Sequence, residues 1–314
     1  LDFQYVKNLL TDWAKSGLKS VILIGGGEPT LYPRFEEIVK LLKKLSLQIG
    51  IVSNGTRMAS IEKISPWLTK KDWVRLSLDA GRNETFQKIH RPVSRISLEK
   101  IMADTKKMRQ KNAEFQMGYS FLIIGDSKKV KDVKLANNIK EISLAAGLAK
   151  DNGFTYLSLK PFISPEGARE TTIGKKDLEK IKKETEKAKK LENNNFKVIE
   201  SINLFCFYDK ELKKIMRKQP EVCHSQFFRS VVIPAGINNC SLWRGFDNAK
   251  IIDTNQEITE RYYQELNRNR LKLIDDFNAK KICRQVNCLY APLNCWIEDL
   301  IAFPEKLNDL EVID

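Results

Sequence analysis

The sequence predicts an α/β fold built on a parallel sheet, followed by a separate region that holds all of the cysteines. Helical and strand patterns alternate over roughly residues 1–170, and this alternation is typical of a parallel sheet flanked by helices. The six cysteines are at positions 206, 223, 240, 283, 288 and 295, so none precedes Cys206. This asymmetry divides the chain into an α/β half and a cysteine-bearing half.

The α/β half begins with a helix, a strand and a glycine turn. Apolar residues recur at helical spacing over residues 3–13, and Gly17 stands where such a helix would end. Residues 21–24 form a short apolar run, typical of a strand buried on both faces, and the turn Gly25-Gly26-Gly27-Glu28-Pro29-Thr30 follows it. Pro33 then favours the start of a second helix, with its apolar stripe over residues 35–45.

The same strand-and-turn pattern recurs along this half. Further strands are expected at residues 47–52, 73–78, 115–124 and 154–160. The first two end in Ser53-Asn54-Gly55-Thr56 and Asp79-Ala80-Gly81. Because ligands of parallel α/β folds bind at the carboxyl edge of the sheet, these turns are the expected ligand site.

The pattern changes after about residue 170. A charged helix is expected from about residue 175, ending near the asparagines at 193–195, and a hairpin is expected over 227–239. Cys223 precedes this hairpin and Cys240 follows it, and a helical stretch at 259–279 leads to the remaining cysteines. The predicted division is a partial barrel at 1–173, a linker helix at 174–196 and a cysteine-rich domain at 197–314.

Composition excludes a membrane protein and favours an anionic partner. The chain has 42% hydrophobic and 30% charged residues, and no apolar run is long enough for a membrane helix. Without a signal peptide, a cytoplasmic location is expected, where clustered cysteines favour metal over disulfides. The net charge of +14 suits an acidic peptide, a phosphorylated metabolite or RNA. Nucleic acid is the less favoured partner, because the Lys-rich run at 175–190 has the spacing of a solvated helix.

The turns after the strands resemble those of radical S-adenosylmethionine (SAM) enzymes. Gly26-Gly27-Glu28-Pro29 resembles the family's glycine–glycine–glutamate motif, and the turns at 53–56 and 77–81 match later strand ends. Leu159-Lys160-Pro161 with Gly167-Ala168-Arg169 matches a further one. The resemblance implies a partial (β/α)6 radical SAM barrel, which binds SAM and is served by an external electron donor such as flavodoxin or ferredoxin.

The resemblance also implies which residues bind SAM. The turn from Gly25 to Pro29 would hold the amino group of its methionine part, with the backbone close to the ligand and the Glu28 carboxylate on the ammonium. Ser53, Asn54, Ser77 and Asp79 would lie near the ribose or the methionine carboxylate. Ile123 and Leu159 would lie near the adenine.

One feature of the family is absent from this sequence. The catalytic [4Fe–4S] cluster of radical SAM enzymes is bound by three closely spaced cysteines before the first helix, and no cysteine precedes Cys206. The chain also starts at Leu1 without a methionine. We expect the catalytic-cluster ligands to lie upstream of Leu1; the alternative is a homologue that has lost catalysis.

The later cysteines resemble the SPASM and twitch extensions of radical SAM enzymes, which hold auxiliary [4Fe–4S] clusters. The resemblance implies one auxiliary cluster, with candidate ligands Cys223, Cys240, Cys283, Cys288 and Cys295. The first four are the predicted set, with Cys295 as the substitute for one of them. Cys206 lies between two phenylalanines and is either a buried thiol or a hydrogen-atom donor. A structural zinc remains an alternative for the same thiolates.

The resemblance implies an enzyme that generates a 5′-deoxyadenosyl radical and abstracts hydrogen from a substrate C–H bond. The expected substrate is a peptide or protein, as for enzymes that mature ribosomally made peptides. A small-molecule dehydrogenase or epimerase is the nearest alternative. A catalytically inactive SAM-fold binding protein with a structural metal is the alternative from another class.

Overall fold

The computed structural model describes residues 1–93, 96–125, 129–130, 133–162, 173–283 and 288–310. The chain forms two compact units, here called the sheet unit (Leu10–Phe207) and the cysteine unit (Leu1–Leu9 with Tyr208–Asp314). Helix α1 (Phe3–Lys15) contributes residues to both. No described helix combines the length and the apolar character needed to cross a membrane.

The sheet unit is built on six parallel strands in the order β1-β2-β3-β4-β7-β8. These strands are β1 (Ser20–Leu23), β2 (Gln48–Ser53), β3 (Trp73–Ser77), β4 (Gln116–Ile123), β7 (Tyr156–Pro161) and β8 (Lys197–Glu200). A separate two-stranded ribbon joins β5 (Lys129–Val130) to β6 (Val133–Lys134). The predicted α/β class and its parallel sheet are thereby confirmed.

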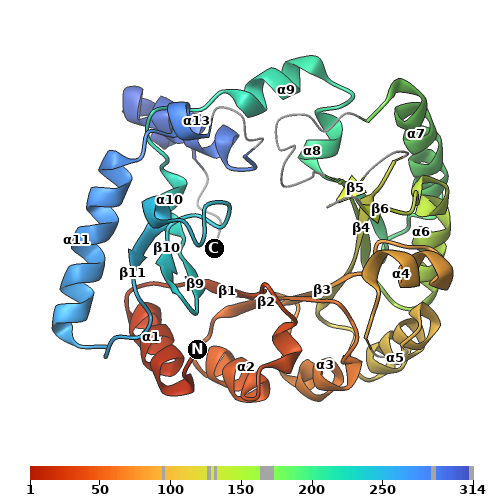
Figure 1. Ribbon diagram of the computed structural model, residues 1–314, viewed down its shortest axis with the longest axis horizontal. Helices are drawn as coiled ribbons and strands as arrows, with labels where there is room; N and C mark the ends of the chain where they lie inside the picture. The colour runs from red at the N-terminus through yellow and green to blue at the C-terminus, as the bar shows by residue number, and fades with distance from the viewer. Residues whose placement is uncertain (94–95, 126–128, 131–132, 163–172, 284–287, 311–314) are drawn as a thin grey trace. The chain divides into compact units, whose positions relative to one another are not determined.

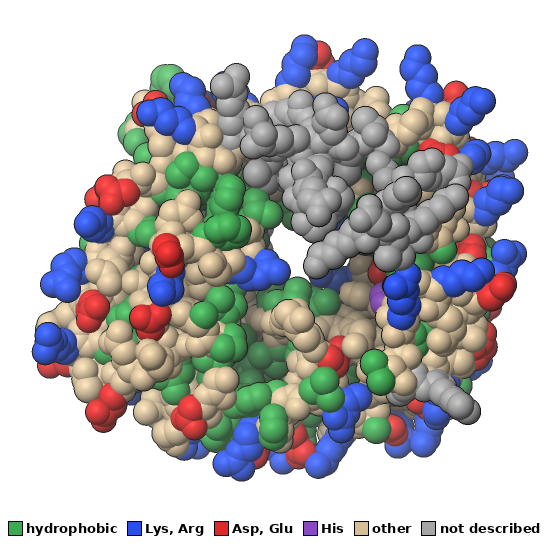
Figure 2. Space-filling view, viewed as in Figure 1, with side chains coloured by type: hydrophobic (Ala, Val, Ile, Leu, Met, Phe, Trp, Pro, Cys, Tyr) green, Lys and Arg blue, Asp and Glu red, His purple; other side chains and the backbone are tan. Residues whose placement is uncertain are grey.

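Helices follow the strands and line one face of the curved sheet (Figure 1). The longer ones are α2 (Phe35–Lys44), α3 (Met58–Ile64), α4 (Asn83–His90), α5 (Leu98–Lys111), α6 (Ile142–Asp151) and α7 (Lys175–Lys189). Short turns of helix are η1 (Pro29–Leu31), η2 (Ser65–Trp67), η3 (Ile139–Glu141) and α8 (Ile202–Phe205). Figure 2 shows Lys and Arg side chains along α7, which buries Ile181 and Ala188 and leaves most of its lysines in solvent.

The two faces of the sheet differ in burial. Val74, Leu76, Tyr119 and Leu157 are fully buried on the helix-covered face. The residues between them alternate to the opposite face, here called the inner face. Ile22 and Ile199 on the inner face are 54% and 47% exposed. The hydrophobic core of the unit therefore lies between the sheet and its helices.

The domain division differs from the one predicted. Strand β8 pairs with β7 in parallel, and α7 packs against α6, so residues 174–200 complete the sheet unit and do not link two domains. The sheet unit ends at Phe207 and not at residue 173. Parallel pairing requires a crossover connection, and α7 supplies it between β7 and β8.

The cysteine unit contains a small antiparallel sheet in the order β11-β10-β9, formed by β9 (Val231–Ile233), β10 (Gly236–Asn238) and β11 (Lys250–Ile252). The predicted hairpin is confirmed, because Ile233 pairs with Gly236 across a two-residue turn. Gly236 has a φ of +152°, and a Cβ there would lie 2.7 Å from the carbonyl oxygen of Ile252. Only glycine therefore fits the start of β10.

Helices complete the cysteine unit around this sheet. They are α9 (Lys210–Arg217), α10 (Ser225–Phe228), η4 (Asp247–Ala249), α11 (Glu260–Asp276), α12 (Ala279–Ile282), α13 (Ala291–Ala302) and η5 (Pro304–Asp309). The chain start is fastened here, because the hydroxyls of Tyr5 and Tyr262 lie 2.6 Å apart. Helix α11 confirms the helical stretch predicted at 259–279.

Asp72 lies just before β3 and supports the amino ends of β2 and β3. It should make the stability of the sheet unit depend on pH. Its buried carboxylate accepts hydrogen bonds from Lys43 Nζ at 2.6 Å, Ile49 N at 2.8 Å and Thr69 N at 2.8 Å. Burial raises the pKa of Asp72, but these hydrogen bonds outweigh it and hold the pKa below its usual value. A depressed folded-state pKa contributes stability above the unfolded-state pKa of about 3.9, and that stability is lost as the pH falls through the folded pKa.

We therefore expect Asp72→Asn to lower the free energy of unfolding by about 2–4 kcal/mol at pH 7. The deficit should shrink as the pH falls below about 4, because the unfolded state binds a proton there, and should vanish below the depressed folded-state pKa. Urea unfolding at several pH values measures it, with Asp151→Asn, an exposed carboxylate, as the control. A deficit that is the same at pH 7 and pH 3 would contradict this role.

Candidate SAM and iron–sulfur sites

The carboxyl ends of β1 and β2 are joined by the carboxylate of Glu28. Its Oε1 accepts hydrogen bonds from Thr30 Oγ1 at 2.7 Å and from Ser53 Oγ at 2.9 Å, and its Oε2 accepts one from Asn54 N at 2.7 Å. Ser53 Oγ in turn accepts a hydrogen bond from Gly55 N at 3.1 Å. The predicted residues at these two strand ends are thereby brought together.

Asn54 stabilises the second turn. Its Oδ1 accepts hydrogen bonds from the backbone N and the hydroxyl of Thr56, at 2.9 and 2.7 Å. Gly55 between them has a φ of +76°, a left-handed conformation that favours glycine. The side chains of Ser53 and Asn54 thus act on the protein's own backbone, a role that the sequence did not reveal.

Glycines 26 and 27 leave space for a close ligand. Neither has a positive φ, and a Cβ on either would meet no protein atom within 4 Å. The folded chain itself therefore does not require glycine at these exposed positions. A ligand that packs against the backbone would require it, so this turn fits the amino-acid part of SAM.

Gly27→Val should weaken SAM binding while leaving the fold intact. Because no protein atom surrounds the new side chain, the change in unfolding free energy should be small, whereas the ligand would be displaced from the backbone. We expect SAM affinity to fall about tenfold or more, measured by calorimetry on cluster-loaded protein. Gly174→Val, another glycine whose Cβ would meet nothing, is the control. Equal affinity in the two variants would remove this turn from the site.

Asp79 follows β3, two residues after its last residue, at the same edge of the sheet. It has a φ of +54°, and its Oδ1 accepts a hydrogen bond from Leu122 N at 2.6 Å. Its Oδ2 lies 3.3 Å from His90 Nε2, a contact that is an ion pair only when His90 is protonated. Ser77 ends β3 two residues earlier, on the inner face. Asp79 therefore fixes the end of β3 against β4 at the expected ligand edge.

Two residues that sequence reasoning missed hold this edge in place. Asn138 donates to the carbonyl oxygens of Asp79 and Leu122, both at 2.8 Å, and accepts from Ile124 N at 2.8 Å. The buried carboxylate of Glu141 accepts from Gly81 N at 2.7 Å and from Thr85 Oγ1 at 2.6 Å. Nothing in the sequence pattern marked this segment, which precedes α6 and is distant from the turns it supports.

Ile123 and Leu159, which the resemblance places near the adenine, are both buried. Strand alternation puts both side chains on the helix-covered face, where they are 2% and 0% exposed. Their carbonyl oxygens are also occupied, by Phe162 N and Ser201 N. Their place beside the adenine stays a prediction. The predicted residues Gly167, Ala168 and Arg169 lie outside the described ranges.

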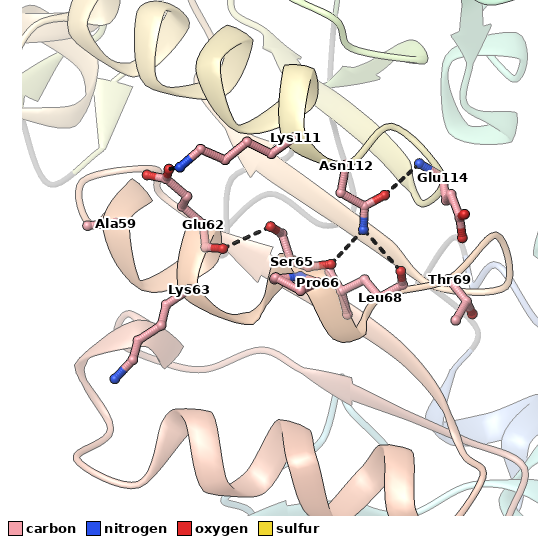
Figure 3. Close-up of a pocket in the computed structure, with 10 residues that line it drawn as sticks. All are labelled: Ala59, Glu62, Lys63, Ser65, Pro66, Leu68, Thr69, Lys111, Asn112 and Glu114. Atoms are coloured by element: carbon pink, nitrogen blue, oxygen red, sulfur yellow. Dashed lines mark hydrogen bonds and ion pairs between the residues drawn. The ribbon is translucent and has the colours of Figure 1, made fainter.

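A surface pocket lies at the other end of the strands from this edge. It has a volume of about 790 Å³ and lies beside α3 and the end of α5, before the starts of β3 and β4 (Figure 3). Its polar groups bond one another: Asn112 Nδ2 donates to Ser65 O at 2.7 Å and to Leu68 O at 3.2 Å. This arrangement joins helices at the opposite end of the strands and is not the candidate site.

Four cysteines converge in the cysteine unit. Cys223 and Cys283, each 7% exposed, share one apolar cluster with Phe277, and Ala279 N donates to Glu221 O at 2.8 Å between their segments. The pKa of Cys283 is raised to about 11. Burial is the main cause and the nearby Cys288, Cys240 and Cys223 add to it, whereas the indole of Trp243 acts to lower it. Burial likewise raises the pKa of Cys288, with Cys223 and Cys240 adding to the effect.

Polar donors surround these sulfurs. Asn294 Nδ2 lies 3.6 Å from Cys223 Sγ, and an amino nitrogen of Arg229 lies 3.7 Å from Cys240 Sγ. The Arg229 guanidinium is stacked 3.9 Å from the ring centre of Tyr290. Its charge acts against the effect of burial, which raises the pKa of Cys288 overall. The predicted set Cys223, Cys240, Cys283 and Cys288 therefore shares one environment, rich in donors to sulfur.

The other two cysteines lie elsewhere. Cys295 Sγ is 3.6 Å from Lys218 O, and its charge neighbours are Lys218 and Glu298 and none of the four thiols. Cys206 is buried in the sheet unit, directly after α8. No described cysteine is in a disulfide. Among the described residues, no three His, Cys, Asp or Glu side chains are arranged to hold a single metal ion.

Several known proteins resemble parts of this chain. An S-adenosyl-L-methionine-dependent tRNA 4-demethylwyosine synthase from Methanocaldococcus jannaschii is 37% identical over 71 residues, 23% of this chain and 21% of that protein. An S-adenosylmethionine-dependent nucleotide dehydratase from a Thermoplasmatales archaeon is 35% identical over 63 residues, 19% of this chain and 21% of that protein. The curated relatives are matched over only 18% to 48% of their own lengths.

A solved structure has the same fold over most of the chain. SuiB of Streptococcus suis superposes with a TM-score of 0.58 at 15% identity, covering 90% of this chain and 61% of SuiB. Residues 1–136 match the sequence profile of the family described as Radical SAM superfamily. This match contains the turns at Glu28, Ser53 and Asp79, whose hydrogen bonds shape the candidate SAM edge. The residues that form the candidate SAM edge are thus similar to the radical SAM superfamily.

Proposed function

We propose that the full-length protein is a radical SAM enzyme that modifies a peptide and carries one auxiliary [4Fe–4S] cluster. The convergence of Cys223, Cys240, Cys283 and Cys288 carries the proposal. When bound, SAM and a catalytic [4Fe–4S] cluster would supply a 5′-deoxyadenosyl radical for hydrogen abstraction. The chain's own residues orient the cofactor at the ends of β1, β2 and β3 and provide the thiols of the second cluster.

The donor set supports an iron–sulfur cluster more than a zinc ion. A zinc ion draws four sulfurs to about 2.3 Å from one centre. The other thiols of the set raise the pKa values of Cys283 and Cys288, so the four lie close enough to share one metal group. A cubane separates its cysteine ligands more widely, and thiolates are its usual ligands. The hydrogen-bond donors at Cys223 and Cys240 suit the sulfur-rich anion.

A peptide substrate is favoured by the extent of the fold likeness. The SuiB structure determined with its precursor peptide SuiA covers 83% of this chain at a TM-score of 0.57 and 14% identity. The likeness therefore extends well beyond residues 1–136. The chain's net charge of +14 would favour an acidic peptide.

Two measurements test the proposal. Anaerobically prepared protein should contain about four iron and four sulfide per chain from the auxiliary site alone, with the corresponding electron paramagnetic resonance signal after reduction. Full-length protein should form 5′-deoxyadenosine from SAM and alter the mass of an acidic peptide encoded beside its gene. Stoichiometric zinc without sulfide would support instead a binding protein with a structural metal.

Arg229 should raise the reduction potential of the auxiliary cluster. A cation beside Cys240 and Cys288 stabilises the more negatively charged, reduced cluster. We expect Arg229→Gln to keep full iron content and to shift the midpoint potential to more negative values in a spectroscopic redox titration. Arg244→Gln, an exposed arginine four residues beyond Cys240, is the control. An unchanged potential in Arg229→Gln would show that this guanidinium serves packing only.

A further inference from the structure

Two cations face the inner side of the sheet without an acceptor among the described residues; Arg75 contacts only the ring of Trp73, 5.4 Å from its centre. Arg75 on β3 shares this face with Trp73, and Lys160 on β7 shares it with Tyr156. Within the described ranges, neither cation forms a hydrogen bond or an ion pair, and the Arg75 Nε is buried with no acceptor. Because an unpaired, partly buried cation is costly, this arrangement indicates a site that an anion completes.

Glycines open the inner face around Arg75. A Cβ at Gly50 would lie 2.2 Å from the ring of Trp73, and a Cβ at Gly118 would lie 2.2 Å from the ring of Tyr156. Both rings therefore lie flat against the sheet, over the neighbouring strands. Gly118 is the register partner of both Arg75 and Tyr156, so no side chain stands between them. Arg75 is thus flanked by the rings of Trp73 and Tyr156.

The carboxylate nearest to this pair is already engaged. Asp79 Oδ1 accepts from Leu122 N, and its Oδ2 contacts His90. The pKa of Lys160 is lowered to about 8. Burial is the main cause and Arg75 adds to it, whereas Asp79 acts in the opposite direction. Lys160 and Arg75 thus act on each other as like charges. Among the described residues, the nearby groups leave the positive charge of the pair uncompensated.

We propose that Arg75 and Lys160 bind an anionic group of the substrate, a carboxylate or a phosphate, on the inner face of the sheet. The inference rests on the proposed function, since it assigns the part of that site that selects the substrate. Lys160 lies near the carboxyl end of β7, level with Leu122 at the end of β4, on the same edge as the candidate SAM turns. An anion held there would orient the substrate toward the cofactor edge.

Binding of simple anions to the full chain tests this site. Glutarate and methyl phosphate are titrated by calorimetry at constant ionic strength, so that the tighter probe identifies a carboxylate or a phosphate as the natural group. We expect one-to-one binding that weakens about tenfold in Arg75→Gln and in Lys160→Met, and that is unchanged in Lys70→Met, an exposed lysine. Glutarate binding should also weaken between pH 7 and 9 as Lys160 loses its proton, and not in Lys160→Met.

Stability and SAM affinity separate a binding role from a structural one. Lys160→Met removes a partly buried charge, so its thermal midpoint should equal or exceed that of the wild type. A large drop in this midpoint, or anion binding that is equal in both variants and wild type, would overturn the proposal. SAM affinity of cluster-loaded Lys160→Met should stay within about twofold of wild type. A parallel loss would show that the anion is the cofactor's own carboxylate, and would also overturn it.

The test of the anion site does not depend on whether the substrate is a peptide. Anion binding is measured without turnover, so a chain that binds glutarate at Arg75 and Lys160 but modifies no peptide would refute only the proposed substrate. Conversely, peptide modification that survives in both variants would refute only the anion site.

Discussion

Cys283→Ala should remove the auxiliary cluster, whereas Cys295→Ala should leave it in place. Loss of one of four thiolate ligands opens an iron site to solvent, and such clusters are lost readily in water. We expect iron and sulfide from this site to fall from about four per chain to near zero in Cys283→Ala. Anaerobic iron and sulfide analysis, together with the visible absorption of the cluster, measures the loss.

Cys295 provides a matched control because it lies on α13 apart from the four thiols. Its nearest recorded partner is Lys218 O, so its removal should cost no iron. Cys206→Ala in the sheet unit should likewise keep full iron. If Cys295→Ala loses iron while Cys283→Ala retains it, the ligand set is different although the cluster exists. Retention of iron in Cys223, Cys240, Cys283 and Cys288 variants alike would refute the cluster itself.

The second large effect is expected for Asn138→Leu. The substitution leaves three buried backbone groups unpaired, the carbonyl oxygens of Asp79 and Leu122 and the amide of Ile124. At about 1–3 kcal/mol for each unsatisfied buried group, partly relieved by relaxation, the free energy of unfolding should fall by about 3–5 kcal/mol. Urea unfolding of the whole chain measures it.

Asn195→Leu provides the matched comparison, because the Asn195 side chain is exposed in the turn before β8. Its unfolding free energy should change by less than about 0.5 kcal/mol. If Asn138→Leu were equally mild, the ends of β3 and β4 would not depend on this side chain. The role assigned to it at the ligand edge would then be withdrawn.

Local patterns predicted the strands and turns well because the physics that forms them is local. Residues 21–24 were expected as a strand and β1 spans Ser20–Leu23, but the strand is exposed or half-buried and not buried on both faces as expected. The hairpin between Cys223 and Cys240 was also predictable, because Gly236 and its flanking apolar residues are a local turn signal. The chosen four cysteines share one environment, although their spacing alone did not separate Cys288 from Cys295.

Features that depend on distant partners could not be read in this way. Strand β8 is short and charged, and it becomes a strand because the edge of β7 offers it hydrogen bonds. Asn138 and Glu141 look like ordinary polar residues until the fold brings the ends of β3 and β4 beside them. Ile123 and Leu159 were placed by resemblance alone, and the two-residue period of a strand assigns them to the helix-covered face.

The contact between Tyr5 and Tyr262 has a consequence for the order in which the chain folds. The two hydroxyls lie 2.6 Å apart but are separated by 257 positions in sequence. Units generally fold as they leave the ribosome, and residues 10–207 are synthesised long before Tyr262. The contact of Tyr5 can therefore form only after Tyr262 has been translated. Tyr5 thus reaches its final place later than the sheet unit that follows it in the sequence.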